Sequence, residues 1–239
     1  MIKLDELPNS LPPKRITAII DTALCIGAGG SSGSLADKPI IRNAEGNLLI
    51  PASQLKGRLR HECEKIARGL KWDICYSPNP QNMCPQRAGL DGNFAREEYE
   101  VSNYQTHHCL ICQIFGNPVL SSRIIFDDLV YEEDPENLPE VLRPGVTINR
   151  SRNTAEERKL YFLETSPANT KLRFTGNIYL SSVPNYGSAL ILAGLRHINA
   201  LGGSKSAGLG WLHWELPALP IEQDVWDFLA KGVGNNEKD

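Results

Sequence analysis

The sequence predicts a single α+β domain of the ferredoxin-like class, an open antiparallel sheet with two helices on one face. Segments of strand and helix character follow one another in the order strand, helix, strands, helix, strand. The chain has 239 residues, of which 41% are hydrophobic, and this is enough to bury one full core. No internal repeat divides the chain, so we expect one domain over residues 1–239 that carries insertions.

The first part of the chain predicts a strand, a small hairpin and a long helix. Residues 14–27 are rich in isoleucine and threonine and end on glycine, which indicates a strand. Residues 39–51 place two apolar runs around the turn-forming sequence NAEGN and indicate a hairpin. Ser53 is a suitable N-cap for the helix that follows. The buried stripe of this helix recurs at helical spacing and consists of Leu55, Leu59, Cys63, Ile66, Ala67 and Leu70.

The middle of the chain predicts an insertion, a strand and a long hairpin. Residues 71–117 lose periodicity and gain proline, asparagine and four cysteines, which is typical of an irregular insertion. RIIFDDLVYEE, residues 123–133, returns to strand character, and Asp127 and Asp128 within it are expected to be solvated. TINRSRNTAEERKLYFLE, residues 147–164, has two β-leaning arms around a polar centre and predicts a hairpin with its tip near 153–157.

The last part of the chain predicts a strand, a helix, a strand and a short final helix. Residues 171–182 alternate in polarity as a strand does. Residues 186–203 predict a helix that ends at a glycine pair, with a buried side made of Leu190, Ile191, Leu195, Ile198 and Leu201. Residues 210–216 close the domain as a strand, and residues 220–232 predict the final helix.

The cysteines are the strongest local signal of a site. Four of them fall in the irregular insertion without core periodicity: Cys75, Cys84, Cys109 and Cys112. The last two form the sequence CLIC, a spacing that lets both thiolates reach one ion from a tight turn. Four soft ligands suit tetrahedral zinc, and we expect a structural ion that folds the insertion. His107 or His108 is an alternative to one cysteine, and four unrelated thiols are the alternative to a metal site.

The stretch LGGSKSAGLGWL, residues 201–212, is a second candidate site. Its four glycines allow backbone amides to approach a phosphate closely, and Lys205 adds positive charge. A plain glycine turn between helix and strand explains the same residues equally well, and the spacing of a Walker loop is absent.

Charge and composition limit which cellular compartment and which binding partners we expect. The net charge of −3 does not indicate a nucleic-acid protein, so local basic clusters would have to carry such a role. Neither a long apolar run nor a secretory leader is present in the sequence. We therefore expect a cytoplasmic protein without a membrane partner, whose cysteines are free thiols or metal ligands.

Four motifs, taken together and in this order, resemble the repeat-associated mysterious protein (RAMP) superfamily, in particular the backbone subunits of type III CRISPR effector complexes. The motifs are IPASQLKGRLRHE, CLICQIFG, SRIIFDD and GGSKSAGLGW, and the match covers most of residues 15–216. The resemblance implies an RNA-recognition-motif-like palm and a thumb hairpin over residues 144–164, with a zinc-binding insertion over residues 71–117. It also implies copies stacked along a guide RNA, other type III effector subunits as neighbours, and cleavage of the paired target RNA.

The resemblance implies roles for individual residues. Guide phosphates would be held by Ser53, Lys56, Arg58 and Arg60 at the helix start, and by Gly202, Gly203, Lys205, Gly208 and Gly210 in the glycine-rich loop. The thumb tip would wedge into the duplex of guide and target, with Arg150 and Arg152 near phosphate. Tyr161, Phe162 and Trp211 are expected to pack rather than to stack on bases. Asp37, in SLADKPII, lies where active members carry the catalytic aspartate.

Asp37 has a chemical role in this reading. A nucleotide splayed from the duplex can align its 2′-hydroxyl with the adjacent phosphorus, and only RNA offers that internal nucleophile. Asp37 would hold Mg²⁺ or Mn²⁺ beside the phosphate, or it would accept the hydroxyl proton. The metal role is favoured because an exposed aspartate, with a pKa of about 3.9, is a poor base near neutral pH. The alternatives are a turn aspartate in a subunit that binds guide RNA without cutting, and a zinc-stabilised module with no RNA role.

Overall fold

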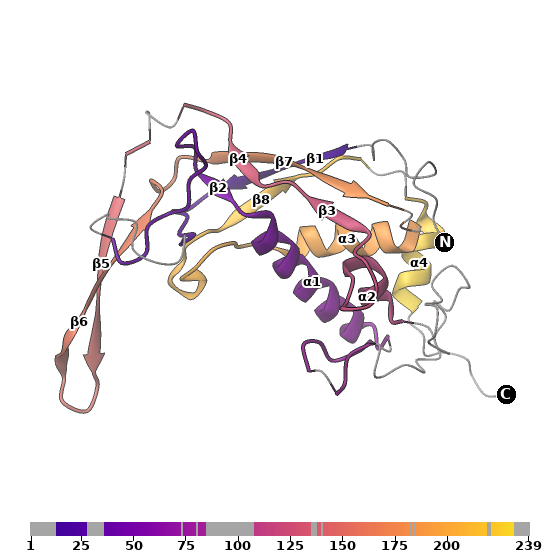
Figure 1. Ribbon diagram of the computed structural model, residues 1–239, viewed down its shortest axis with the longest axis horizontal. Helices are drawn as coiled ribbons and strands as arrows, with labels where there is room; N and C mark the ends of the chain where they lie inside the picture. The colour runs from indigo at the N-terminus through magenta and orange to yellow at the C-terminus, as the bar shows by residue number, and fades with distance from the viewer. Residues whose placement is uncertain are drawn as a thin grey trace.

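The structure is a computed structural model that describes residues 13–27, 36–72, 74–79, 81–84, 108–134, 138–139, 141–181, 183, 185–218 and 221–231. It has a mixed α/β architecture with a six-stranded antiparallel sheet and a separate two-stranded hairpin. Helices α1, α2, α3 and α4 all lie on the same side of the sheet (Figure 1). The opposite face of the sheet is left without a helical layer in the part of the chain that is described.

The sheet has the strand order β2-β4-β7-β1-β8, with β3 also paired to β7. The strands are β1 (Pro13–Ile20), β2 (Leu49–Ile50), β3 (Ile124–Phe126), β4 (Leu129–Tyr131), β7 (Leu172–Leu180) and β8 (Leu212–Glu215). Buried and half-buried residues alternate along β7. Leu172, Phe174 and Ile178 are buried and face the core, on the side of the sheet that the helices cover. The first strand is shorter than residues 14–27, and beyond Ile20 only Gly27 bridges to Ile40.

The predicted strand over residues 123–133 is divided in two by Asp127 and Asp128. β3 and β4 pair with successive parts of β7, and Gly176 lies opposite the break. A Cβ atom at Gly176 would lie 2.7 Å from the carbonyl oxygen of Asp128, so the bend requires a residue without a side chain. The two aspartates are also not simply solvated, because Asp127 accepts hydrogen bonds from Asn177 and Tyr179 at 3.0 Å each.

Helix α1 (Ala52–Gly69) buries Leu55, Leu59, Cys63 and Ala67 of the predicted stripe, whereas Ile66 and Leu70 are half-buried. The start of the helix differs from the prediction. Its N-cap is Pro51, which makes no side-chain cap, and Ser53 lies exposed inside the first turn. The backbone N–H of Ala52 instead donates to Oδ1 of Asp128 at 2.7 Å. The expected Ser53 cap was therefore wrong, because an acceptor 76 residues away in the chain satisfies the first turn.

The remaining helices complete the layer below the sheet. These are α2 (Leu110–Phe115), α3 (Asn185–His197) and α4 (Gln223–Lys231). The predicted buried side of α3 is confirmed, and it continues past the helix end through Ile198 and Leu201. Helix α1 packs on α3, and α3 packs on α4.

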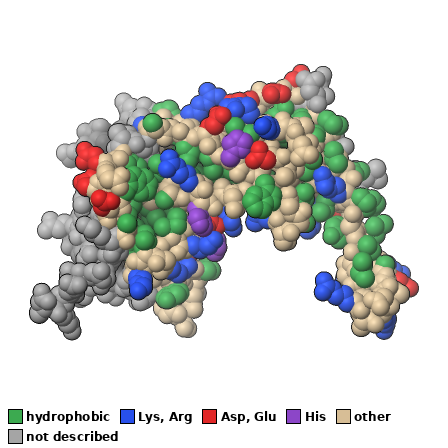
Figure 2. Space-filling model, turned by 180° about the vertical axis from the view of Figure 1, so that it is seen from behind, with side chains coloured by type: hydrophobic (Ala, Val, Ile, Leu, Met, Phe, Trp, Pro, Cys, Tyr) green, Lys and Arg blue, Asp and Glu red, His purple; other side chains and the backbone are tan. Residues whose placement is uncertain are grey.

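The hairpin of β5 (Val141–Asn149) and β6 (Thr154–Thr165) projects from the body of the molecule (Figure 1). Its turn covers residues 150–153, slightly before the expected tip, and its register shifts between Val146 and Ile148. The space-filling view shows the surface hollowed between the hairpin and the helical body, with hydrophobic side chains along the hairpin and Lys and Arg at its tip (Figure 2). The molecule therefore has the outline of an arch.

Candidate functional site

Asp37 lies at the base of the long hairpin, hydrogen-bonded to β6. The backbone N–H of Phe162 donates to Oδ2 of Asp37 at 2.7 Å, and the N–H of Asp37 donates back to the carbonyl oxygen of Phe162 at 3.0 Å. The next residue, Lys38, forms a parallel bridge with Leu163. The exposed Asp37 side chain is thus held by the hairpin strand at a defined position.

The buried carboxylate of Glu164 lies next to this contact between the Asp37 segment and β6. Glu164 accepts a hydrogen bond from the backbone N–H of Ile40 at 3.0 Å and from Nη2 of Arg42 at 3.4 Å. Its own N–H donates to the carbonyl oxygen of Lys38 at 3.2 Å. The sequence did not single out Glu164, because a glutamate near the end of a β-leaning arm looks like an ordinary surface residue.

The glycine-rich loop also packs near the base of the hairpin, through residues 23–25 and Leu163. Gly203 donates its N–H to the carbonyl oxygen of Cys25 at 2.7 Å, and Gly210 donates to that of Ala23 at 2.8 Å. Leu163 of β6 packs against a small cluster made of Ala23, Cys25 and Leu209. The structure therefore brings together the Asp37 segment, the base of the hairpin and the glycine-rich loop, which are far apart in the sequence. We call this region the junction.

The glycines of the loop are required first by the protein's own packing. Gly202 and Gly210 have φ values of +87° and +73°, and a Cβ atom on either would lie within 2.5 Å of a backbone carbonyl oxygen. Gly208 also has a positive φ, but nothing lies within 4 Å of a Cβ built there. The amides of Gly203 and Gly210 are already bonded within the chain, so phosphate contact by this loop stays a prediction. The exposed Lys205 donates to the carbonyl oxygen of Gly202 at 3.0 Å.

The basic residues at the start of α1 are largely engaged inside the protein. Lys56 donates to Oγ of Ser122 at 2.8 Å, and burial together with the charge of Arg60 lowers the pKa of Lys56. Arg58 forms an ion pair with Glu62 at 2.8 Å. These contacts leave less free charge for phosphate than the sequence suggested, and the RNA role of this helix start stays a prediction.

Glu62 ties α1 to α3. Its side chain is fully buried, and its carboxylate lies 2.6 Å from Nδ1 of His197 and 3.0 Å from Nζ of Lys65. Burial alone would raise the pKa of Glu62, but the hydrogen bonds from His197 and Lys65 and the charge of Arg58 outweigh burial, so the pKa lies below its ordinary value.

The four predicted metal ligands form a cluster in the core. The sulfur atoms of Cys75, Cys84, Cys109 and Cys112 all lie within 4.8 Å of one another, and all four residues are buried. Around a tetrahedral zinc with Zn–S bonds of about 2.3 Å, neighbouring sulfurs would be about 3.8 Å apart. The observed spacing and the four soft donors therefore fit zinc. Hydrogen bonds from the sulfurs of Cys109 and Cys112 lower the pKa of both Cys75 and Cys84.

Of the two histidine alternatives, His108 does not belong to this group of ligand atoms. His108 is buried, its Nδ1 lies 2.7 Å from Nδ2 of Asn117, and burial lowers its pKa. His107 lies outside the described residues, as does most of the predicted insertion between residues 85 and 107.

Arg60 belongs to the surroundings of the cysteine cluster. Its guanidinium donates to the carbonyl oxygen of Gly116 at 2.9 Å and lies 3.9 Å from the sulfur of Cys112. It also pairs with Glu64 at 3.2 Å. Four thiolates around one zinc would carry a net charge of about −2, which a nearby guanidinium partly offsets. Arg60 therefore lies beside the cysteine cluster, whereas the sequence predicted it at a phosphate site together with Ser53, Lys56 and Arg58.

Three aromatic side chains are more exposed than the sequence predicted. Trp211 is 47% exposed, Tyr161 40% and Phe162 36%, so none of the three is a core residue, and the expectation that they pack rather than stack on bases stays a prediction. All three lie at or beside the junction, on β6 or directly after the glycine-rich loop. A β-leaning pattern does not reveal whether a second layer covers the strand, and the projecting hairpin has none in the described structure. Arg150 and Arg152 are exposed at the hairpin turn.

The helix-free face of the sheet carries paired charges. Arg15 pairs with Glu132 at 2.7 Å, and Arg173 pairs with Glu215 at 2.6 Å. These two pairs bind equal numbers of positive and negative side chains, so they leave the net charge of −3 unchanged.

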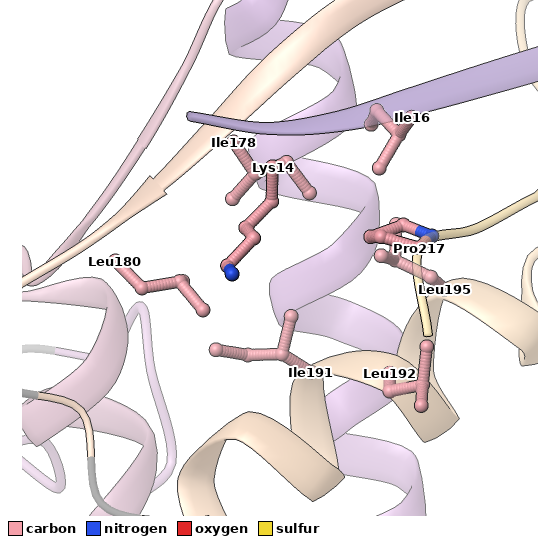
Figure 3. A pocket seen from close by; sticks show the side chains of 8 residues that line it. All are labelled: Lys14, Ile16, Ile178, Leu180, Ile191, Leu192, Leu195 and Pro217. Atoms are coloured by element: carbon pink, nitrogen blue, oxygen red, sulfur yellow. The ribbon is translucent and has the colours of Figure 1, made fainter. Parts of the chain in front are cut away.

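A small pocket between the sheet and α3 is lined by apolar side chains and one lysine (Figure 3). Lys14 reaches from β1 into the space between Leu180 and Ile191, and the other lining side chains are apolar. The pocket lies at the start of β1, whereas the junction follows the end of that strand. It is therefore separate from Asp37, the glycine-rich loop and the base of the hairpin.

Comparison with known proteins gives one family. The sequence model of the RAMP superfamily matches residues 17–213. "CRISPR system Cms endoribonuclease Csm3" of Methanocaldococcus jannaschii is 28% identical over 215 residues, which cover 82% of this chain and 75% of that protein. The family match begins within β1 and ends within β8, so it contains the junction and the cysteine cluster. Among the described helices, none has both the length and the apolar composition needed to cross a bilayer.

Proposed function

Because the chain belongs to the RAMP superfamily, as its four motifs predicted, we propose that it is a backbone subunit of a type III CRISPR effector complex. In this proposal it binds guide RNA, stacks against further copies and other effector subunits, and cleaves the paired target RNA. The name of its relative, an endoribonuclease of a CRISPR system, supports this class of activity.

The observation that carries the proposal is the junction. Asp37, the base of the hairpin and the glycine-rich loop are separated in the sequence, yet hydrogen bonds and one apolar cluster join them. Asp37 has an exposed side chain at the foot of a projecting hairpin. It is therefore suited to contact a target RNA strand that the hairpin distorts.

The sheet supports the proposed palm. Without β2 and β3, the order β8-β1-β7-β4 is the strand order of a ferredoxin-like sheet, in which the first and third strands lie side by side in the centre. Helices α1 and α3 lie on one face, each between two strands in the sequence. We assign the β5–β6 hairpin as the thumb.

Asp37 has a definite part in the proposed reaction. Its Oδ2 accepts the Phe162 N–H, which leaves Oδ1 as a possible ligand of a divalent cation together with phosphate oxygens and water. Such an ion would stabilise charge on the phosphate while the neighbouring 2′-hydroxyl gives its proton to water and attacks the phosphorus, and the bond from phosphorus to the 5′-oxygen of the next nucleotide breaks. The chain's own contribution is to hold Asp37 rigidly and to keep the target nucleotide splayed with the exposed hairpin.

The cysteine cluster has a different proposed role. Zinc held by its four thiolates would fix the segments 74–79 and 81–84 to α2 and to the core, with no open position for chemistry. The zinc site is therefore structural in this proposal, and the cleavage ion is a separate one.

The test is cleavage of target RNA by the assembled complex carrying Asp37→Ala. We expect loss of the cut that faces this subunit, while complexes with Asp37→Ala keep guide and target RNA. Asp227→Ala, an exposed change on α4, is the matched control and should cut normally. Unchanged cutting by Asp37→Ala at the facing site would remove the enzymatic part of the proposal.

A non-cleaving subunit of the same kind of complex is the second candidate. It is favoured by the fact that half of the Asp37 carboxylate is already bonded to the hairpin backbone. This candidate predicts intact target RNA beside every wild-type copy, even with Mg²⁺ or Mn²⁺ present. Salt-dependent binding of guide RNA distinguishes both candidates from a zinc module with no RNA role.

A further inference from the structure

The segment that carries Asp37 is attached to β6 at successive residues. Phe162 exchanges two hydrogen bonds with Asp37, and Glu164 donates its N–H to Lys38. The last attachment is made by a side chain, because the N–H of Ile40 donates to Oε2 of Glu164 at 3.0 Å. Residues 37–40 therefore lie alongside β6, with one parallel bridge between Lys38 and Leu163.

Glu164 is a buried charge within this attachment. The residue is 5% exposed, and a carboxylate at such a position requires hydrogen bonds or an opposite charge. Both of its side-chain partners, the Ile40 N–H and the Arg42 guanidinium, follow Asp37 within five residues. The Glu164 carboxylate thus fixes the segment after Asp37, while Phe162 fixes Asp37 itself.

The orientation of Asp37 depends on this spacing. The Phe162 N–H holds Oδ2, and within the described residues no hydrogen bond involves Oδ1. The direction of Oδ1 is therefore set by how closely the Asp37 segment lies against β6. A small change in that distance would turn the carboxylate oxygen that remains for a cation or for RNA.

We infer that Glu164 is a positioning residue for RNA cleavage, which sets the orientation of Asp37 without contacting RNA. The inference rests on the proposed function. A merely structural ion pair would change stability and leave the cleavage rate of folded complexes unchanged. A positioning residue changes the cleavage step while binding of guide and target stays the same.

The experiment compares Glu164→Ala and Glu164→Gln in the assembled complex, with single-turnover cleavage of saturating target RNA in Mn²⁺. We expect Glu164→Ala to slow the facing cut by about 10- to 100-fold, the range seen when supporting partners of a catalytic group are removed. Glu164→Gln should slow it less, because its amide oxygen can still accept the Ile40 N–H. Target affinity should stay within about twofold of the wild type. The control is Glu222→Gln, an exposed glutamate near α4.

Hydrogen exchange gives a second readout that does not depend on activity. In Glu164→Ala the amides of Lys38 and Ile40 should exchange faster than in the wild type, while those of β7 stay protected. Should Glu164→Ala fail to assemble, Glu164→Gln and Arg42→Met carry the same comparison, with smaller slowing expected for both. Wild-type cleavage rates in every folded Glu164 and Arg42 variant would overturn the inference. Normal cutting by Asp37→Ala would instead overturn the proposed function, so the two failures are distinguishable.

Discussion

At the scale of single residues, Gly208 and Gly210 share a positive φ and differ in their surroundings. A Cβ atom at Gly210 would lie 1.8 Å from the carbonyl oxygen of Leu201, whereas one at Gly208 meets nothing within 4 Å. Backbone strain is therefore common to both, and steric overlap belongs to Gly210 alone. The sequence shows four glycines in this loop without distinguishing these reasons.

Alanine substitutions should separate the two effects. Gly208→Ala should lower the free energy of unfolding by about 1–2 kcal/mol, which is the strain of a left-handed conformation. Gly210→Ala should lower it by about 3 kcal/mol or more, because the backbone must also move away from Leu201. Urea unfolding of both variants measures the difference. Equal losses would show that the loop can open around Gly210 without a penalty.

The residues of the junction show how far single positions could be predicted. Asp37 was found because its place among four motifs resembles a known family, since an acid in a glycine-rich loop says little by itself. Glu164 and Phe162 could not be found in this way. Their roles come from a backbone N–H that meets Asp37 and a buried carboxylate that meets the N–H of Ile40, and both contacts form only in the folded chain.

At the scale of elements, the helices follow from local patterns and their ends do not. The buried stripe of α1 could be counted from the sequence, because side chains three and four apart share one face of a helix. The acceptor that completes its first turn is Asp128, which lies in the break between β3 and β4. Ser53, the better cap by residue type, stays exposed because the tertiary partner is already in place.

The contact of α1 with α3 predicts a pH dependence through Glu62. The pKa of Glu62 is lowered in the folded state, so its stabilisation is complete above the unfolded value of about 4.3 and is lost as pH falls through the folded pKa. We expect Glu62→Gln to lower the unfolding free energy by about 2 kcal/mol at neutral pH, with a smaller difference from the wild type below about pH 4.

Thermal and urea unfolding across this pH range measures the effect. Glu45→Gln, at an exposed turn position, is the control and should show no such convergence. A difference between wild type and Glu62→Gln that stays constant down to strongly acidic pH would mean that the charge of Glu62 does not stabilise the helix pair.

At the scale of the whole molecule, the cysteine cluster is continuous with the main core. Cys75, Cys84, Cys109 and Cys112 belong to the same buried cluster as Phe174 of the central strand. A zinc ion at this place would thus stabilise the whole domain rather than a separate insertion. The sequence predicted the ligands, but it could not show that they lie inside the core.

Removal of one ligand should therefore affect global stability. In Cys84→Ser we expect zinc content to fall from about one per chain to a small fraction, and Tm to fall by about 10 °C or more. Cys63→Ala is the matched control, because Cys63 is buried outside the cluster and bonds to the carbonyl oxygen of Leu190. It should lower Tm without releasing zinc. Retention of zinc by Cys84→Ser would exclude this residue as a ligand.

The sequence by itself determined the class of elements, the buried faces of both long helices, the cysteine set and the family. These follow from periodicity, residue type and short motifs, all of which act over a few residues. The tertiary structure alone decided which segments meet: the attachment of Asp37 to β6, the engagement of Arg60 beside the cysteines, and the exposure of aromatic side chains on the hairpin. Such contacts join residues far apart in the chain, and their energies depend on burial and distance, which exist only once the chain has folded.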